Sequence, residues 1–179
     1  MKNNPKPSSL RVRIYPDPVL TEVCETVEDV NEEVLAYIER MKIVLKSMSN
    51  GIGLAASQVG LLLRIYVAYD KLEPGNAGEL VAYINPSFKP DENNKAEYES
   101  EGCLSFPGIS GDVERPTKGV LTYTNESGKK VEEHVESLKA RCAQHEIDHL
   151  MGISLPQSMT EASLKKSKQM LNRLSKRRR

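Results

Sequence analysis

The chain has 179 residues and a mass of 20.0 kDa, and 39% of its residues are hydrophobic and 28% charged, as expected for one globular domain with its own core. No apolar run approaches the roughly 20 residues that span a bilayer, and three cysteines at irregular spacing do not suggest a disulfide framework. We therefore expect a protein of the reducing cytoplasm with no membrane contact; an organellar form stays open.

The net charge of zero conceals an asymmetry along the chain. Residues 160–179 contain eight Lys or Arg and one Glu, a net of +7, so residues 1–159 carry a net of −7. A basic tail of this kind is typical of a solvated helix end. The alternative is an electrostatic contact with RNA or another polyanion.

The first elements follow a basic, proline-containing leader, residues 1–13, which we expect to be disordered. Asn31 is a typical helix cap, and the apolar residues after it recur at helical spacing as far as Asn50. Residues 64–69 and 80–84 have the composition of strands, with a turn-prone segment at 73–76 between them.

The second half of the chain predicts a hairpin and two helices. Residues 119–124 and 131–136 are expected to be the arms of the hairpin. A helix should then run over residues 137–151 and stop at Gly152, and Thr160 can cap a final basic helix. The pattern favours an α+β domain in which mostly antiparallel strands pack around a central helix, with further helices near both ends.

The chemically most informative segment is His145-Glu146-Ile147-Asp148-His149. Residues four apart lie on one face of a helix, so both imidazoles can bind one metal ion. The glutamate between them can take a proton from a water that the metal has made more acidic. The segment therefore indicates metal-assisted hydrolysis, and the alternative is a solvated helix face that happens to hold two histidines.

A catalytic metal usually has a third protein ligand, and no residue downstream of His149 fits that role. Cys103 is the best upstream candidate because it follows a predicted strand in Glu-Gly-Cys-Leu-Ser, and a thiolate with two imidazoles suits zinc or ferrous iron. Cys142 is the other cysteine to weigh, and we expect it to be a packed thiol that lines the pocket. The glycine-rich residues 51–60 suggest close backbone approach, and Gln58 is their long polar side chain.

Three segments together resemble the signature motifs of the peptide deformylases, in the same order and with similar separations. They read Gly-Ile-Gly-Leu-Ala-Ala-Ser-Gln-Val-Gly from residue 51, Glu-Gly-Cys-Leu-Ser from residue 101, and Gln-His-Glu-Ile-Asp-His-Leu-Met-Gly from residue 144. The likeness extends from about Ile14 to Gly152 and weakens after it. It implies a catalytic domain over residues 14–159, followed by a basic helix or tail over residues 160–179.

The resemblance implies removal of the N-formyl group from the formyl-methionine that begins new polypeptides. It places one divalent metal ion, Fe(II) in the first instance with Zn(II), Ni(II) or Co(II) able to replace it, on Cys103, His145 and His149. Glu146 would be the general acid and base, and Gln58 and the backbone N–H of Leu104 would stabilise the oxyanion.

The same resemblance assigns the substrate contacts. Ile52, Gly53 and Gly102 would pair with the substrate backbone, and Cys142 would form a wall of the methionine pocket. We also expect Asp148 and Gln144 to brace the ligating histidines, because such histidines generally donate their second N–H to a partner. In some relatives a basic C-terminal helix docks at the ribosome, so residues 160–179 are a candidate for that contact.

Three rival interpretations can be weighed against the residues. A zinc protease of the usual helical type needs a third ligand downstream, where the chain has none. A copper electron carrier would use a weak axial methionine such as Met151, which leaves Glu146 without a task. A scaffold protein that had lost activity would be expected to have changed a ligand or Glu146, and all of them are present.

Overall fold

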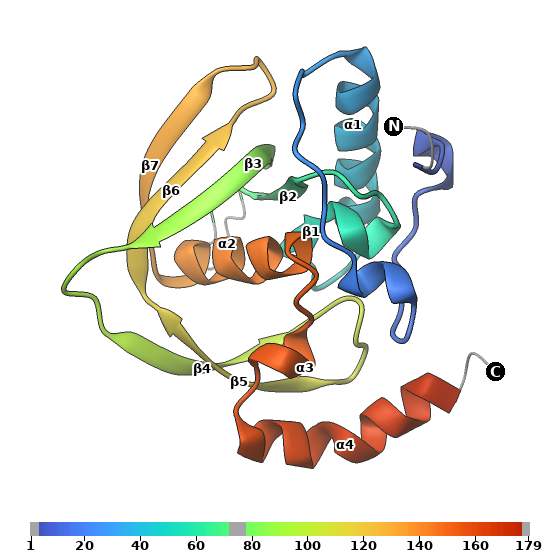
Figure 1. Ribbon diagram of the computed structural model, residues 1–179, viewed down its shortest axis with the longest axis vertical. Helices are drawn as coiled ribbons and strands as arrows, with labels where there is room; N and C mark the ends of the chain where they lie inside the picture. The colour runs from blue at the N-terminus through green and yellow to red at the C-terminus, as the bar shows by residue number, and fades with distance from the viewer. Residues whose placement is uncertain (1–3, 72–77, 177–179) are drawn as a thin grey trace.

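The structure is a computed structural model that describes residues 4–71 and 78–176. It has an α+β fold with antiparallel strands, a central helix and helices near both ends, which confirms the predicted fold class (Figure 1). The turn expected at residues 73–76 lies outside the described residues. Within them, no helix is both long and apolar enough to cross a membrane.

A five-stranded antiparallel sheet, in the spatial order β1-β2-β3-β6-β7, is the largest element of the fold. Its strands are β1 (Gly53–Ala55), β2 (Ile65–Tyr69), β3 (Leu80–Pro90), β6 (Lys118–Thr124) and β7 (Lys130–Glu136). The two predicted strands and the hairpin are therefore confirmed. β3 runs further than expected because it continues past a shift in register between Ile84 and Ser87 to pair with β6.

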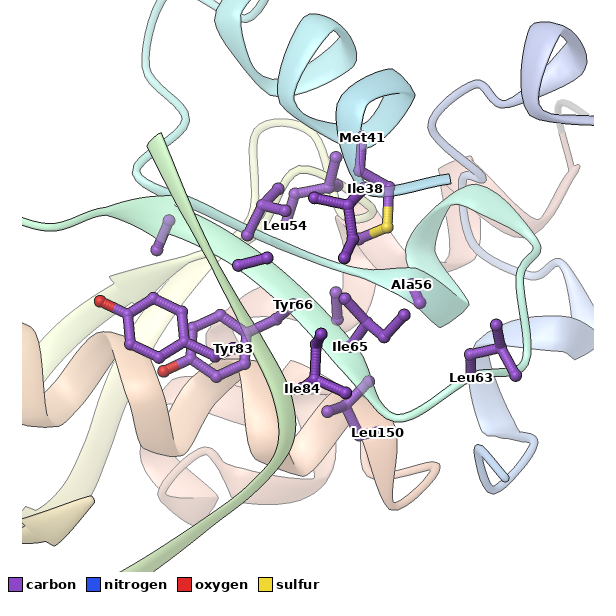
Figure 2. Close-up of a cluster of buried hydrophobic side chains, with 14 of the residues drawn as sticks. Ile38, Met41, Leu54, Ala56, Leu63, Ile65, Tyr66, Tyr83, Ile84 and Leu150 are labelled. Atoms are coloured by element: carbon purple, nitrogen blue, oxygen red, sulfur yellow. The ribbon is translucent and has the colours of Figure 1, made fainter. Parts of the chain in front are cut away.

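Helix α1 (Glu32–Lys46) packs on one face of β1 and β2. Asn31 caps it as predicted, since its Oδ1 accepts a hydrogen bond of 3.0 Å from the Val34 N–H. Figure 2 shows Ile38 and Met41 of this helix against Leu54, while the rings of Tyr66 and Tyr83 lie on the opposite face of the sheet. The apolar spacing thus buries one face of the helix in the main core.

Helix α2 (Ser137–Leu150) covers that opposite face and lies between two sheets. The second sheet has two strands, β4 (Ala96–Gly102) and β5 (Ser110–Pro116), which pair in antiparallel register and lie on the other side of α2 in Figure 1. The helix ends where predicted, because Gly152 has a φ of 74°, a conformation that favours glycine.

Two further helices follow, α3 (Leu155–Ser158) and α4 (Glu161–Lys176). Thr160 caps α4 as predicted, with its Oγ1 accepting from the Ser163 N–H at 3.3 Å. Ser163 is buried against β5, where its Oγ accepts a hydrogen bond of 3.0 Å from the Asp112 N–H. The small serine lets α4 lie directly on β5, so the final helix supports the strand that follows the site.

The expected disordered leader is not what the structure shows for its described part. Pro7–Ser9 form a 3-10 turn, Leu10 is buried in the main core, and the Arg13 N–H donates to the Gln58 carbonyl at 2.7 Å. The basic and proline-rich composition indicated disorder, but Leu10, with Val12 packed against the same core, contributes burial that offsets the cost of ordering this segment. A second 3-10 turn, Pro18–Thr21, leads on towards α1.

Candidate metal centre and active site

Helix α2 presents His145 and His149 on one face, with ring centroids 4.9 Å apart. Cys103 reaches them from the residue after β4, and its Sγ lies 3.2 Å from His149 Nε2. One ligand atom from each of the three residues lies within 4.8 Å of the other two. The structure therefore brings together the three ligands that the sequence indicated, although Cys103 lies 42 residues before His145 in the chain.

The donor set fits a single divalent metal ion. At metal–sulfur and metal–nitrogen distances of about 2.3 and 2.0 Å, tetrahedral angles place the ligand atoms about 3.5 Å from one another. The observed spacing brackets that value, since Cys103 Sγ and His149 Nε2 are 3.2 Å apart and no two of the three ligand atoms are more than 4.8 Å apart. A thiolate and two imidazoles suit zinc or iron better than magnesium or calcium, which prefer oxygen ligands.

The charges around the ligands also favour a cation. Burial opposes protonation of His145, but hydrogen bonds with Cys103 and Glu101 raise its pKa well above the usual value, so the site favours positive charge at this ring. Burial, and then the charge of His145, lower the pKa of His149 well below its usual value. That ring is therefore neutral and able to bind metal.

Glu101 braces His145, a role that the sequence analysis missed. Its Oε2 accepts from His145 Nδ1 at 2.9 Å, which leaves Nε2 of the ring for the metal. Burial alone would raise the pKa of Glu101, but hydrogen bonds from His145 and Arg115 lower it to about 2. The sequence did hold a signal for this role, because Glu101 lies in the same motif two residues before Cys103. Residues two apart on a strand point to the same face of the sheet.

Asp148 and Gln144 do not accept a hydrogen bond from the ligating histidines, contrary to expectation: Glu101 pairs with His145 Nδ1, and His149 Nδ1 has no partner among the described residues. Asp148 instead forms an ion pair of 3.0 Å with Arg115 and accepts a hydrogen bond from Ser158. Gln144 donates to the carbonyl of Pro116 at 2.9 Å. Both side chains join α2 to neighbouring segments, so they stabilise the helix and its surroundings.

Glu146 is positioned as a proton carrier beside the metal ligands. It is 3% exposed, and burial raises its pKa to about 7, although the charge of His145 and the backbone of Ala55 act in the opposite direction. Its Oε2 has no hydrogen-bond partner among the described residues. A carboxyl group with this pKa can both accept and release a proton near neutral pH.

Gly53 of β1 lies directly against this carboxylate. A Cβ at this position would be 2.6 Å from Glu146 Oε1 and 2.9 Å from Cys142 Sγ, and both distances are shorter than an ordinary van der Waals contact. The glycine-rich residues were expected to allow close backbone approach, and at Gly53 the structure confirms it.

Gln58 lies in the 3-10 turn η3 (Ala56–Val59), with its amide group held from both ends. Its Oε1 accepts from the Ala55 N–H at 2.9 Å, so its Nε2 faces the site, 3.3 Å from both Cys103 Sγ and Ser105 Oγ. Ser105 is a second residue whose part in the site could not be anticipated. The amide is therefore a preorganised donor.

These groups line one cavity of about 800 Å³. The predicted ligands, catalytic groups and substrate-binding residues that line it are Ile52, Gly53, Gln58, Gly102, Cys103, Leu104, Cys142, His145 and Glu146. The third ligand, His149, is buried and does not line the cavity. Apolar side chains of Met48, Ile109 and Leu138 line the same cavity. The space is large enough for more than one residue of an extended substrate.

A buried acid–base carboxylate beside a Cys-His-His metal site, in a cavity that holds a preorganised amide donor, defines the class of metal-dependent hydrolases. Comparison with known proteins narrows the class. Residues 9–165 match the family model described as polypeptide deformylase. The peptide deformylase of Fusobacterium nucleatum is 41% identical over 145 residues, which cover 80% of this chain and 79% of that protein.

Solved structures agree with the sequence comparison. A peptide deformylase from Plasmodium falciparum is 34% identical with a TM-score of 0.84, covering 93% of this chain and 95% of that one. The Thermotoga maritima peptide deformylase is 38% identical with a TM-score of 0.75, covering 84% and 97%. This chain belongs to the peptide deformylase family, whose members are metal-binding hydrolases that act in N-terminal processing of new proteins.

Proposed function

We propose that this chain removes the formyl group from the N-terminal formyl-methionine of new polypeptides and releases formate. Family membership supports the reaction, and the observation that carries the assignment of roles is Glu146, a buried carboxyl with a pKa of about 7 beside the three metal ligands. A protease that cuts internal peptide bonds is the rival reaction for this ligand class.

Cys103, His145 and His149 would hold the metal, which when bound would act as a Lewis acid on the formyl carbonyl and increase the acidity of water. Glu146 takes the proton of the attacking water and passes it to the departing amine. The proton thus moves from water to the new N-terminus through one carboxyl group, and formate and a free methionine N-terminus are the products.

Negative charge develops on the formyl oxygen during the attack. Gln58 Nε2, fixed by the hydrogen bond between its Oε1 and the Ala55 N–H, donates to that oxygen together with the backbone N–H of Leu104. Because both donors are held in place before the reaction, they need no reorganisation as charge develops.

The substrate enters as an extended chain end between two backbone segments. Ile52, Gly53 and Gly102 all line the cavity, where their main-chain groups can pair with the peptide. Cys142 forms part of the wall for the methionine side chain, and burial keeps its thiol protonated by raising its pKa well above the usual value. It therefore serves as an apolar surface and not as a nucleophile.

The reaction is tested by formate release from formyl-Met-Ala-Ser, with acetyl-Met-Ala-Ser as the matched substrate. We expect formate and a free amine from the first peptide and no product from the second. The methyl group of the acetyl peptide would need space beside Glu146 and Gly53 that the hydrogen of a formyl group does not. Cleavage within either peptide would favour a protease and contradict the proposal.

For the metal we propose Fe(II), with Zn(II), Ni(II) or Co(II) able to take its place, because the thiolate and imidazole ligands accept all four. The measurement is metal content and activity of protein purified anaerobically from cells grown in ordinary medium. Iron at one equivalent together with full activity agrees with the proposal, whereas zinc as the active native metal overturns it.

We also propose that α4 contacts ribosomal RNA in the cytoplasm. Residues 160–179 carry a net of +7, and Lys165, Lys166 and Lys168 are exposed on the helix. Replacing these three lysines by glutamine should weaken cosedimentation with ribosomes and reduce its dependence on salt. The control replaces Lys129 and Lys130, which are exposed at the β6–β7 turn, and equal losses in both variants would contradict a specific role for α4.

A further inference from the structure

The metal ligands stand on two separate supports. Cys103 follows β4, whose sheet partner among the described strands is β5 alone, whereas His145 and His149 lie on α2 against the five-stranded sheet. No strand is shared between these two sheets in the described part of the chain. The distance between cysteine and histidines therefore depends on the groups that join the β4–β5 hairpin to α2 (Figure 1).

Arg141 of α2 joins the helix to the β4–β5 hairpin through several hydrogen bonds and an ion pair. Its Nη1 donates to Glu101 Oε1 at 2.8 Å and to the Val113 carbonyl at 3.1 Å. Its Nη2 donates to the Glu97 carbonyl at 2.9 Å, and its Nε lies 3.1 Å from Glu99 Oε2. The side chain is only 8% exposed, and it holds both strands of the hairpin from one position on the helix.

Glu101 connects this contact to the metal ligands. Its carboxylate receives four N–H bonds, two from Arg115, one from Arg141 and one from His145 Nδ1. Arg141 lies one helical turn before His145, and Glu101 lies two residues before Cys103. One carboxylate therefore orients a histidine ligand from α2 and fixes the end of the strand that presents the cysteine.

We propose that Arg141 is a positioning residue of the metal site, which sets the position of Cys103 relative to His145 by clamping the β4–β5 hairpin and the Glu101 carboxylate to α2. The clamp needs the planar guanidinium, because a lysine ammonium is a point charge that cannot bond to groups on both strands in this arrangement. The proposal rests on the metal-binding part of the proposed function and uses nothing about the substrate.

The test compares zinc-loaded wild-type protein with Arg141→Lys, which keeps the charge, and Arg141→Met, which keeps most of the volume. Lys139→Met is the matched control, since Lys139 lies on the same helix and pairs with Glu133 of β7, away from the hairpin. Zinc release to a chelator is followed by stopped-flow absorbance. We expect both Arg141 variants to lose zinc about tenfold to a hundredfold faster, as for other residues that support metal ligands, and the control to match wild type.

A second measurement separates positioning from general loosening of the fold. In the cobalt-loaded protein, the thiolate-to-cobalt charge-transfer absorption band depends on the placement of Cys103. This band should therefore weaken or shift in both Arg141 variants. Wild-type zinc release, or an unchanged cobalt spectrum with only a lower melting temperature, would overturn the proposal. If Arg141→Met does not fold, Arg141→Lys decides by the same two measurements.

The result does not depend on the reaction. A wild-type protein that releases no formate would contradict the proposed function, while faster zinc release from the Arg141 variants would still support the clamp. Full deformylase activity of the wild-type protein, together with unchanged zinc release and cobalt spectrum in the Arg141 variants, would support the proposed function and contradict the clamp.

Discussion

Replacing Gly53 by alanine is expected to displace the catalytic carboxylate without disturbing the metal. The new Cβ would lie 2.6 Å from Glu146 Oε1, where ordinary contact begins at 3.4 Å, so the two must separate by about 0.8 Å. The backbone at Gly53 is not in the left-handed region, so the effect comes from the contact alone. Misplacing a reacting group by about 1 Å can lower the rate about 10²-fold, or about 2.7 kcal/mol of barrier.

The assay is kcat for formate release, together with zinc content and unfolding temperature. Overpacking should also reduce the free energy of unfolding by about 1–3 kcal/mol. Gly102→Ala is the matched control, because a Cβ there meets nothing within 4 Å, so its stability and kcat should stay at wild-type values and any change should fall in KM. A Gly53→Ala protein with wild-type kcat would refute the argument that the position of Glu146 limits catalysis.

Two further predictions concern residues beside the metal ligands. Gln58→Ala should keep its metal and lower kcat about 10²–10³-fold, because one oxyanion donor is lost; steady-state kinetics with metal analysis checks this, and an unchanged kcat removes Gln58 from the mechanism. In metal-free protein, Glu101 has a pKa lowered from 4.5 to about 2, so the stability it contributes is present above pH 4.5 and is lost as the pH falls towards 2. Urea unfolding at several pH values should show a loss of about 3 kcal/mol over this range. Glu101→Gln should flatten that slope, and an identical slope would contradict the assignment.

Local patterns in the sequence predicted the elements that depend on local chemistry. Asn31 and Thr160 cap helices because a short polar side chain before an apolar periodic run can reach the first free N–H groups. The pair His145 and His149 follows from helical periodicity in the same way. Cys103 was preferred to Cys142 because it follows a predicted strand, and the resemblance to a family supported that choice.

Long-range partners were the part that sequence reasoning could not supply. Asp148 was expected to brace a histidine, but the guanidinium of Arg115 comes from β5, and no local pattern places that strand beside α2. Glu101 braces His145 instead, and its place two residues before Cys103 was the one local signal for that role. The leader shows the opposite error, because its composition indicated disorder while the burial of Leu10 depends on a core formed by distant residues.

The most direct test of the central claim is formate release by anaerobically prepared, iron-loaded wild-type protein and its Glu146→Ala variant. Glu146 does not bind the metal in this account, so both proteins should hold one equivalent of iron. We expect wild-type protein to release formate from a formyl-methionyl peptide and the variant to lose turnover. Absence of formate from the wild-type protein, or full turnover in the variant, would contradict the account.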